Sequence, residues 1–263
     1  MNLDKAYDLS AKVCVITGAG GKLGKYYSDI ISQQGAKVIC LDKKFDEDAC
    51  ELAKRNSNIN LFSCDITSKL EVRKIFDDIE KKYGTVDILI NNAAAAQTTF
   101  VEGNLVEFEE FPIEVWQANL DVNLTGTFLC SQMAGKQMLK KGSGVILNIG
   151  STYGLVGCDQ RIYGDSGLNS NCAYAATKSG LNNFTRYLAA YYEGKNIRVN
   201  CLAPGGVYNN QSDEFYNNYL NKTMIKRMAH NDDLGYAVLY LISDASSWVT
   251  GAIQTVDGGF TAW

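Results

Sequence analysis

The chain has 263 residues, of which 46% are hydrophobic and 21% charged, and 25 Lys and Arg stand against 29 Asp and Glu. This composition is typical of a globular protein and excludes a largely disordered or fibrous chain. The net charge of -4 leaves no basic surplus for a phosphate backbone, so we expect no nucleic-acid partner.

The sequence contains few indications of a targeting segment, a membrane span or a metal site. The stretch up to Lys12 mixes Asp and Lys with few apolar residues, which does not fit a signal peptide, and no run of about 18 apolar residues follows. We therefore expect a cytoplasmic protein without membrane spans. None of the 8 cysteines forms a CxxC motif, which favours reduced thiols. His230 is the only histidine, so we expect neither a Ser/His/Asp triad nor a bound metal.

Short apolar runs alternate with helical stretches along the whole chain. The runs lack period-two alternation, as is typical of parallel strands covered on both faces. Strands are predicted over Val13–Thr17, Lys37–Asp42, Asn60–Asp65, Asp87–Asn91, Gly144–Ile149, Ile197–Ala203 and Ala252–Val256. The clearest helices are predicted over Ser68–Tyr83 with a capping box of Ser68 and Glu71, from Pro112 to about Lys140, and from about Cys172 to Glu193. The pattern predicts one doubly wound (Rossmann) α/β domain over residues 1–263, with a seven-stranded parallel sheet and helices on both faces.

A glycine cluster follows the first predicted strand directly. Its sequence is Thr17-Gly18-Ala19-Gly20-Gly21-Lys22-Leu23-Gly24. In a doubly wound fold this turn brings backbone N–H groups and a helix N-terminus to a pyrophosphate, and glycine permits the close approach. We expect Gly18, Gly21, Lys22, Leu23 and Gly24 to bind a dinucleotide; a tight turn without a ligand is the alternative.

Carboxylates end the next two strands. Asp42 is placed to accept hydrogen bonds from both ribose hydroxyls of NAD and to repel the 2′-phosphate of NADP. Lys43 and Lys44 follow at once and weaken that preference, so NAD is the expected cofactor and NADP the alternative. Asp65 and the neighbouring Ile66 are expected near the adenine, with a cap of the next helix as the alternative for Asp65.

Tyr174 and Lys178 are four residues apart, which puts them on one face of a helix. Tyr191 and Lys195 share this spacing, so spacing alone does not choose between the pairs. Position favours Tyr174, because it follows the strand that ends near Ser151, at the edge where such sheets bind ligands. We expect the ammonium to lower the pKa of the phenol toward neutrality, which suits proton transfer during hydride exchange with nicotinamide.

Together with further motifs, these residues resemble the short-chain dehydrogenases/reductases over nearly the whole chain. The further motifs are Asn91-Asn92-Ala93-Ala94, Val122-Asn123-Leu124-Thr125-Gly126, Pro204-Gly205 and Val256-Asp257-Gly258-Gly259. The resemblance implies four catalytic roles: Tyr174 as general acid/base, Lys178 lowering its pKa and holding the nicotinamide ribose, Ser151 polarising the substrate oxygen, and Asn123 anchoring a water in the proton relay. It also implies cofactor contacts by Asn91, Ala93, Pro204, Gly205 and Val207, with Asn91 near the adenosine ribose.

Structural alternatives exist for several of these residues. A helix-packing residue is the alternative for Asn123, and a strand-end cap is the alternative for Ser151. Asn91 is equally a tie between strand ends, and Gly205 a turn glycine.

Departures from the family pattern concern the substrate. The spacing TGxxGxxG is similar to that of longer, sugar-nucleotide-modifying members, and Lys22 stands where compact members have glycine. The separation of Ser151 and Tyr174 is wider than in compact members. We expect residues 152–171 to form a polar lid with Tyr153, Arg161 and Tyr163 as substrate contacts, or else a loop at a subunit edge. Residues 207–225, with Gln211, are expected to bind substrate, or else to form a plain helical core.

The stretches 151–154, 161–163 and 195–206 also look like a bacterial branch associated with flagellin glycosylation and nonulosonic (legionaminic-type) acid biosynthesis. We therefore expect an NAD(H)-dependent oxidoreductase acting on a hydroxyl or carbonyl carbon of a sugar phosphate or nucleotide sugar. A 3-oxoacyl-type carbonyl reductase and a non-catalytic dinucleotide-sensing protein are the alternatives. The resemblance also implies a homodimer or homotetramer, formed through side chains that an intrachain core would use equally: Phe128, Leu129, Met133, Leu181, Phe184 and Leu188.

Overall fold

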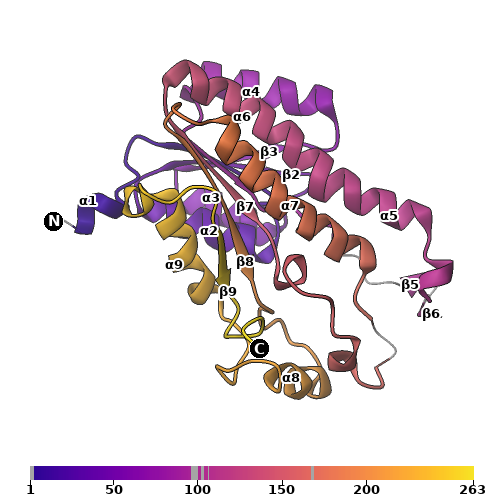
Figure 1. Cartoon of the computed structure of the whole chain (residues 1–263). Coiled ribbons are helices and arrows are strands. Elements are labelled where there is room, and N and C mark those ends of the chain that lie inside the picture. Colours follow the sequence, from indigo (N-terminus) through magenta and orange to yellow (C-terminus); the bar gives the residue numbers. More distant parts are fainter. Residues whose placement is uncertain (1–2, 96–99, 102–103, 106, 167–168) are drawn as a thin grey trace.

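Seven parallel strands form one sheet in the order β3-β2-β1-β4-β7-β8-β9 (Figure 1). The computed structural model describes residues 3–95, 100–101, 104–105, 107–166 and 169–263. The strands are β1 (Val13–Thr17), β2 (Lys37–Asp42), β3 (Ile59–Ser63), β4 (Ile88–Asn91), β7 (Gly144–Ile149), β8 (Ile197–Pro204) and β9 (Ile253–Val256). The strand order reverses between β1 and β4, so the expected doubly wound fold is confirmed.

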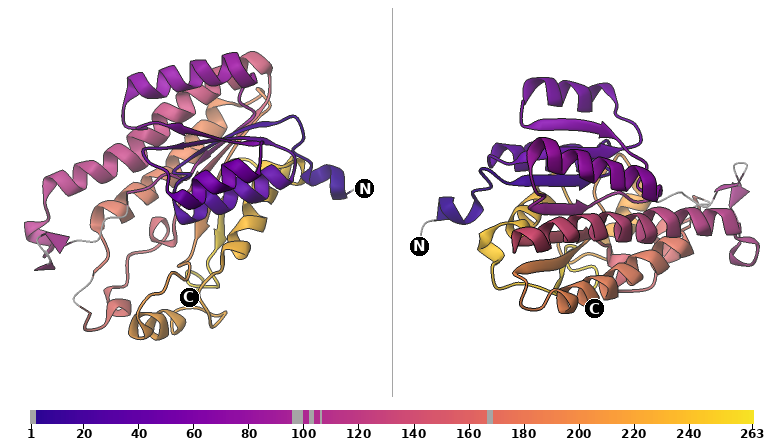
Figure 2. Two further views of the ribbon diagram at one scale, coloured as in Figure 1. Left: turned by 180° about the vertical axis from the view of Figure 1, so that it is seen from behind. Right: turned by 90° about the horizontal axis from the view of Figure 1, so that it is seen from above.

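Helices cover both faces of the sheet, as the uninterrupted apolar strands require (Figure 2). One face carries α2 (Lys22–Gln33), α3 (Glu47–Arg55) and α9 (Asn231–Ile242). The other carries α4 (Lys69–Tyr83), α6 (Thr127–Lys141) and α7 (Cys172–Tyr191). Shorter described elements are α1 (Leu3–Tyr7), β5 (Phe100–Val101), β6 (Asn104–Leu105), α5 (Ile113–Leu120) and α8 (Asp213–Leu220).

The helix predicted from Pro112 to about Lys140 is divided. Pro112 caps α5, and a wide π-helical turn over Asp121–Gly126 separates α5 from α6. Such turns recur at functional sites, because the extra residue changes which side chains face inward. Here the turn contains Asn123, whose side chain is completely buried.

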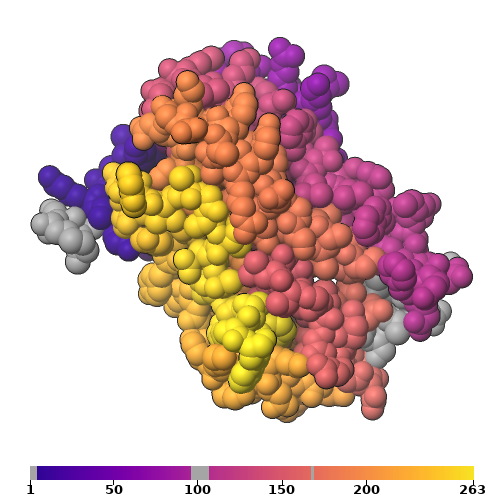
Figure 3. All heavy atoms as spheres, in the orientation of Figure 1, coloured from indigo at the N-terminus to yellow at the C-terminus, as the bar shows by residue number. Residues whose placement is uncertain are grey.

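Beyond the carboxyl ends of the strands, the insertion 152–171 packs against α8 and the C-terminal residues (Figure 3). The insertion contains two short 3₁₀ turns, at Thr152–Gly154 and Gln160–Tyr163. Its contacts form a third apolar cluster with Ile162, Tyr219, Met228 and Phe260 at the centre and Tyr153, Tyr163, Phe215 and Tyr216 around them. The two segments expected to bind substrate are therefore one packed unit.

Candidate active site

Two cavities lie along the carboxyl ends of the strands. The first, of about 490 Å³, lies at the ends of β1, β2 and β3 and is lined by Gly18, Gly21, Gly24, Asp42, Asp65, Ile66 and Ala93, among others. The second, of about 320 Å³, is lined by Ser151, Tyr174, Lys178, Pro204, Gly205 and Val207, among others. Leu23, Asn92 and Ala94 line both cavities, so the two form one continuous cleft.

The glycine turn leaves no room for side chains at Gly18, Gly20 and Gly24. Gly18 has a φ of +65°, and a Cβ there would lie 2.6 Å from the Cα of Ala93. A Cβ on Gly24 would lie 2.2 Å from the carbonyl oxygen of Gly18. Gly21 is the N-cap of α2 and has no side-chain cap, so a helix N-terminus opens at the first cavity. This cradle fits the pyrophosphate of a dinucleotide.

Lys22 lies outside both linings, contrary to the expected cofactor contact. Its Nζ instead donates hydrogen bonds to the carbonyl oxygen of Tyr208 and to Oδ1 of Asn209. The Lys22 side chain thus reaches the segment that follows β8, and the neighbouring Leu23 lines the cleft in its place.

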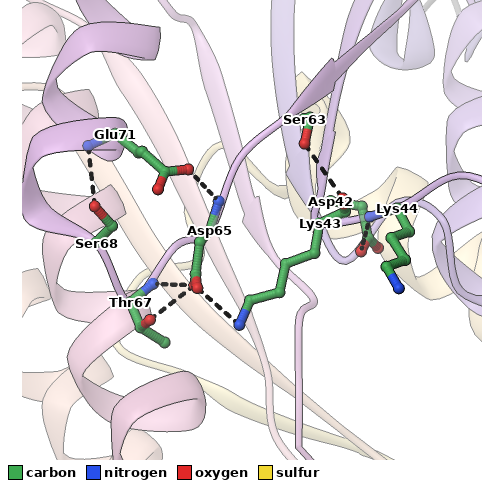
Figure 4. Close-up of polar contacts among 8 residues, drawn as sticks. All are labelled: Asp42, Lys43, Lys44, Ser63, Asp65, Thr67, Ser68 and Glu71. Carbon is green, nitrogen blue, oxygen red and sulfur yellow. Dashed lines mark hydrogen bonds and ion pairs between the residues drawn. The ribbon is translucent and has the colours of Figure 1, made fainter.

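Asp42 and Asp65 both line the first cavity, and their carboxylates are held by the protein (Figure 4). Oδ2 of Asp42 accepts the N–H of Gly20 at 2.9 Å. Asp65 accepts the N–H and hydroxyl of Thr67 and pairs with Lys43 at 2.7 Å. Partial burial raises the pKa of Asp65, but the bonds from Lys43 and Thr67 outweigh it and leave that pKa below its usual value. The carboxylate of Asp65 is thus kept ionised at the wall of the first cavity.

The cap of α4 is Ser68, so the alternative role for Asp65 is not met. Oγ of Ser68 accepts the N–H of Glu71, as predicted. The carboxylate of Glu71, however, accepts the N–H of Asp65 and so joins α4 to the end of the cleft.

Asn91 does not line the cleft, which corrects the prediction that it lies at the adenosine ribose. Its side-chain nitrogen donates to Asn148 at 2.8 Å and to Ser131 at 3.0 Å, inside the layer between the sheet and α6. The alternative role, a tie between strand ends, is the one observed. Successive side chains of a strand point to opposite faces, and the next residue, Asn92, lines the cleft.

Ser151, Tyr174 and Lys178 meet in the second cavity. Ser151 follows β7, and Tyr174 lies in the first turn of α7, whose N-cap Asn171 accepts its N–H. The Nζ of Lys178 lies 5.5 Å from the centroid of the Tyr174 ring and donates to the carbonyl oxygen of Ile149 at 2.6 Å. Position at the sheet edge thus separates this pair from Tyr191, whose side chain is exposed at the far end of α7.

The pKa values differ from the sequence-based expectation. Burial raises the pKa of Tyr174, and its hydrogen bond with Ser151 lowers it by less. Burial also lowers the pKa of Lys178 to about 8. Removing a phenolate from water therefore outweighs the hydrogen bond with Ser151, and the pKa of Tyr174 is raised where the spacing with Lys178 predicts a lowered one.

Asn123 connects the cofactor side of the cleft with the catalytic helix. Its amide nitrogen donates to the carbonyl oxygen of Ala95 and to Thr177, and its Oδ1 accepts the N–H of Ala95. Thr177 in turn donates to the carbonyl oxygen of Tyr174 at 2.9 Å. Both amide hydrogens are used, so the packing role is observed. Holding a relay water stays a prediction and would require another atom of Asn123.

Two of the four expected substrate residues line the second cavity, namely Tyr153 and Tyr163. Arg161 points to solvent and pairs with Asp159, and Gln211 bonds to the backbone of Val207 and Asn209. The expected polar lid is therefore aromatic on its inner side, because an unpaired charge is costly to bury. Phe215 and Tyr219 also belong to the lining. They are four residues apart in a capped helix, a spacing that indicates that both side chains lie on one face of that helix.

Comparisons with known proteins show the family. A family model described as enoyl-(acyl carrier protein) reductase matches residues 18–261. The chain belongs to the short-chain dehydrogenases/reductases. This short-chain dehydrogenase/reductase is an oxidoreductase whose cofactor is a nicotinamide dinucleotide, so the alternative of a non-catalytic sensor is wrong.

Similar proteins include enzymes that act on hydroxyl groups. The NAD-dependent glycerol dehydrogenase of Listeria innocua is 30% identical, with 98% of this chain and 97% of that protein covered. A short chain dehydrogenase from Leptospira borgpetersenii with bound NAD+ is 37% identical over 99% of this chain and 96% of that one, with a TM-score of 0.87. A gluconate 5-dehydrogenase from Burkholderia cenocepacia, in complex with NADP and tartrate, is 26% identical over 100% of both chains, with a TM-score of 0.88.

No helix in the described ranges is long and apolar enough to cross a membrane. Among the described residues, no group of three or more His, Cys, Asp or Glu side chains is arranged to hold a metal ion.

Proposed function

We propose that this enzyme transfers a hydride between NAD(H) and a hydroxyl- or carbonyl-bearing carbon of a small, sugar-like substrate that is uncharged at the reacting end, such as a polyol. The observation that carries the proposal is the lining of the second cavity. Tyr153, Tyr163, Phe215 and Tyr219 surround the catalytic group, and Lys178 is the one charged side chain among the described lining residues. Aromatic faces with hydroxyl groups suit a neutral, hydroxylated ligand.

The catalytic residues donate or accept the proton that is transferred along with the hydride. When bound, the nicotinamide supplies or accepts the hydride. The hydroxyls of Ser151 and Tyr174 hydrogen-bond the substrate oxygen, and Tyr174 donates a proton to it during reduction or takes one from it during oxidation. Because burial keeps the pKa of Tyr174 raised, the phenol is protonated at neutral pH and ready to donate. The ammonium of Lys178 stabilises the phenolate that is left.

The lining of the second cavity also limits how the sugar phosphates and nucleotide sugars expected from the sequence could bind. A phosphate buried beside the catalytic group would need a cation, and Lys178 is already bonded to Ile149. A charged portion of the substrate would therefore extend beyond the second cavity. The narrower assignment to flagellin glycosylation and nonulosonic acid synthesis rests on the sequence resemblance and stays a prediction.

The proposal of NAD over NADP rests on Asp42. Its carboxylate lines the first cavity and is fixed by Gly20, where it would accept ribose hydroxyls and repel a 2′-phosphate. The NAD-dependent glycerol dehydrogenase agrees with this assignment, whereas the gluconate 5-dehydrogenase structure contains NADP.

Turnover of a substrate panel tests the proposal. Glycerol, threitol and gluconate should be compared with sugar phosphates and an acetoacetyl thioester, with NAD(H) and NADP(H) as cofactors. We expect the neutral polyols to give the highest kcat/KM. A preference for the thioester would favour the 3-oxoacyl alternative, which the description of the matching family model supports.

A catalytic variant separates chemistry from binding. Tyr174→Phe should lower kcat by about 10²- to 10⁴-fold while NADH affinity stays nearly constant, because only the exchangeable proton is lost. Tyr191→Phe is the matched control, since Tyr191 lies on the same helix outside both cavities. Undiminished turnover in Tyr174→Phe would refute the assigned role.

A further inference from the structure

A lysine bridge crosses from the glycine turn to the segment that follows β8. The Nζ of Lys22 lies 2.5 Å from the carbonyl oxygen of Tyr208 and 3.3 Å from Oδ1 of Asn209. Lys22 directly precedes Leu23, which lines both cavities, and Tyr208 directly follows Val207, which lines the second. The bridge therefore joins two walls of the cleft next to the place where the cavities meet.

The acceptor end of the bridge is held in place without Lys22. Val207 forms a parallel β-bridge with Ala229, and the N–H of Tyr208 donates to the carbonyl oxygen of Ala229 at 2.9 Å. The side chain of Gln211 accepts the N–H of Asn209 and donates to the carbonyl oxygen of Val207. The backbone that carries both acceptors is thus held by contacts that do not involve Lys22.

Local helix energetics do not account for lysine at this position. Lys22 is the first residue of α2, where the positive end of the helix dipole repels a cation. The first turn contains no acidic residue, and the N-cap Gly21 provides no side-chain bond. The two acceptors across the cleft are therefore the favourable interactions that the ammonium finds.

We propose that Lys22 is a positioning residue for the cofactor: by tying the glycine turn to residues 208–209, it holds the cleft closed and slows release of the dinucleotide. A dinucleotide that occupies both cavities passes between these walls, so opening the bridge is part of its departure. This inference rests on the proposed placement of NAD(H) in the joined cavities.

Stopped-flow displacement of bound NADH by excess NAD+ tests the bridge in the full chain. Lys22→Met should release NADH about fivefold faster than the wild type, the effect of losing an exposed charge-assisted hydrogen bond. Asn209→Ala should release it faster by a smaller factor, and the double variant no faster than Lys22→Met, because both changes break one bridge. Lys22→Arg should restore most of the slow release, and the melting temperature should stay unchanged in all variants.

Lys25→Met is the matched control. Lys25 lies one turn further along α2 and pairs with Asp46 and Asp48, away from the cleft linings. Its replacement removes the same charge from the same helix and should leave NADH release at the wild-type rate.

Three outcomes would overturn the proposal. Wild-type release from Lys22→Met would show that the bridge has no role. Slower, salt-dependent association in Lys22→Met, with wild-type behaviour in Asn209→Ala, would show that Lys22 acts as a charge on the pyrophosphate instead. Failure of the wild-type chain to bind NADH would refute the cofactor assignment itself, and this inference with it.

Discussion

The ammonium of Lys178 donates to the carbonyl oxygen of Ile149 and lies 5.5 Å from the centre of the Tyr174 ring. The side chain is 2% exposed, so a cation is held inside the protein by one backbone oxygen and an aromatic face. Burying a charge costs free energy, and this cost appears as the lowered pKa of Lys178, about 8 against an ordinary 10.5. The buried charge of Lys178 therefore serves catalysis but lowers the stability of the fold.

We predict that Lys178→Met abolishes turnover but stabilises the fold by about 1–2 kcal/mol at pH 7, because a buried charge is replaced by an apolar chain of similar length. The folded wild type binds fewer protons at Lys178 than the unfolded chain between pH 8 and 10.5. The unfolding free energy of the wild type should therefore rise relative to that of the variant as the pH increases through this window. Urea unfolding at pH 7 and pH 9.5 measures both effects. A variant less stable than the wild type at pH 7 would contradict the prediction.

Cofactor choice should respond to Asp42. Asp42→Asn keeps an oxygen for the N–H of Gly20 but removes the charge that repels a 2′-phosphate. We expect the NADPH affinity to rise about tenfold relative to NADH, as fluorescence titration of both cofactors would show. The gain should increase when Asp65→Asn is added, because Lys43 is then released from its ion pair. Asp48→Asn, on the exposed side of α3, is the control. An equal change in relative NADPH affinity in that variant would show that the effect is not specific to the charge of Asp42.

The insertion should act through its aromatic residues. Arg161→Ala and Asp165→Ala are expected to leave KM unchanged, because both residues are exposed and neither lines the second cavity. Tyr163→Ala should raise KM about tenfold, because it removes part of the lining and its contact with Phe215. Steady-state kinetics with the best polyol of the panel measures these KM values. A large increase in KM for Arg161→Ala would contradict the prediction and support the polar lid that the sequence suggested.

An exposed apolar groove lies between α6 and α7. The apolar residues that line its volume of about 410 Å³ include Phe128, Leu139, Phe184, Tyr187, Leu188 and Tyr191, whereas Leu129 and Leu181 are buried within the chain. We predict that Phe128→Glu shifts a homo-oligomer toward smaller species in light scattering, because large exposed apolar patches mark interfaces. Trp248→Glu, at a fully exposed tryptophan outside the groove, should leave the mass unchanged. Identical masses for the wild type and Phe128→Glu would argue against this interface.

The strands could be predicted because each is an apolar run that must be covered on both faces. β1 and β2 match their predicted bounds, and β3 ends two residues before Asp65. The π-helical turn around Asn123 could not be predicted. One extra residue in a helical turn leaves no mark in composition or capping residues, and the apolar pattern continues through it.

In the site, residue type and position at the edge of the sheet placed Tyr174, Lys178 and Asp42 in the cleft, and the family resemblance placed Ser151 there. Asn91 was misplaced because a one-residue change along a strand turns a side chain to the opposite face. Arg161 and Gln211 were misplaced because pairing with Asp159 and with the backbone depends on contacts that the sequence alone does not reveal. The raised pKa of Tyr174 is likewise set by burial, which spacing does not measure.

The amide of Asn123 fastens Ala95, in the lining of the first cavity, to the helix that carries the tyrosine. One amide therefore links the wall of the first cavity to the backbone of the catalytic tyrosine. A dinucleotide held against that wall would keep a constant alignment with the phenol, because both depend on the same side chain.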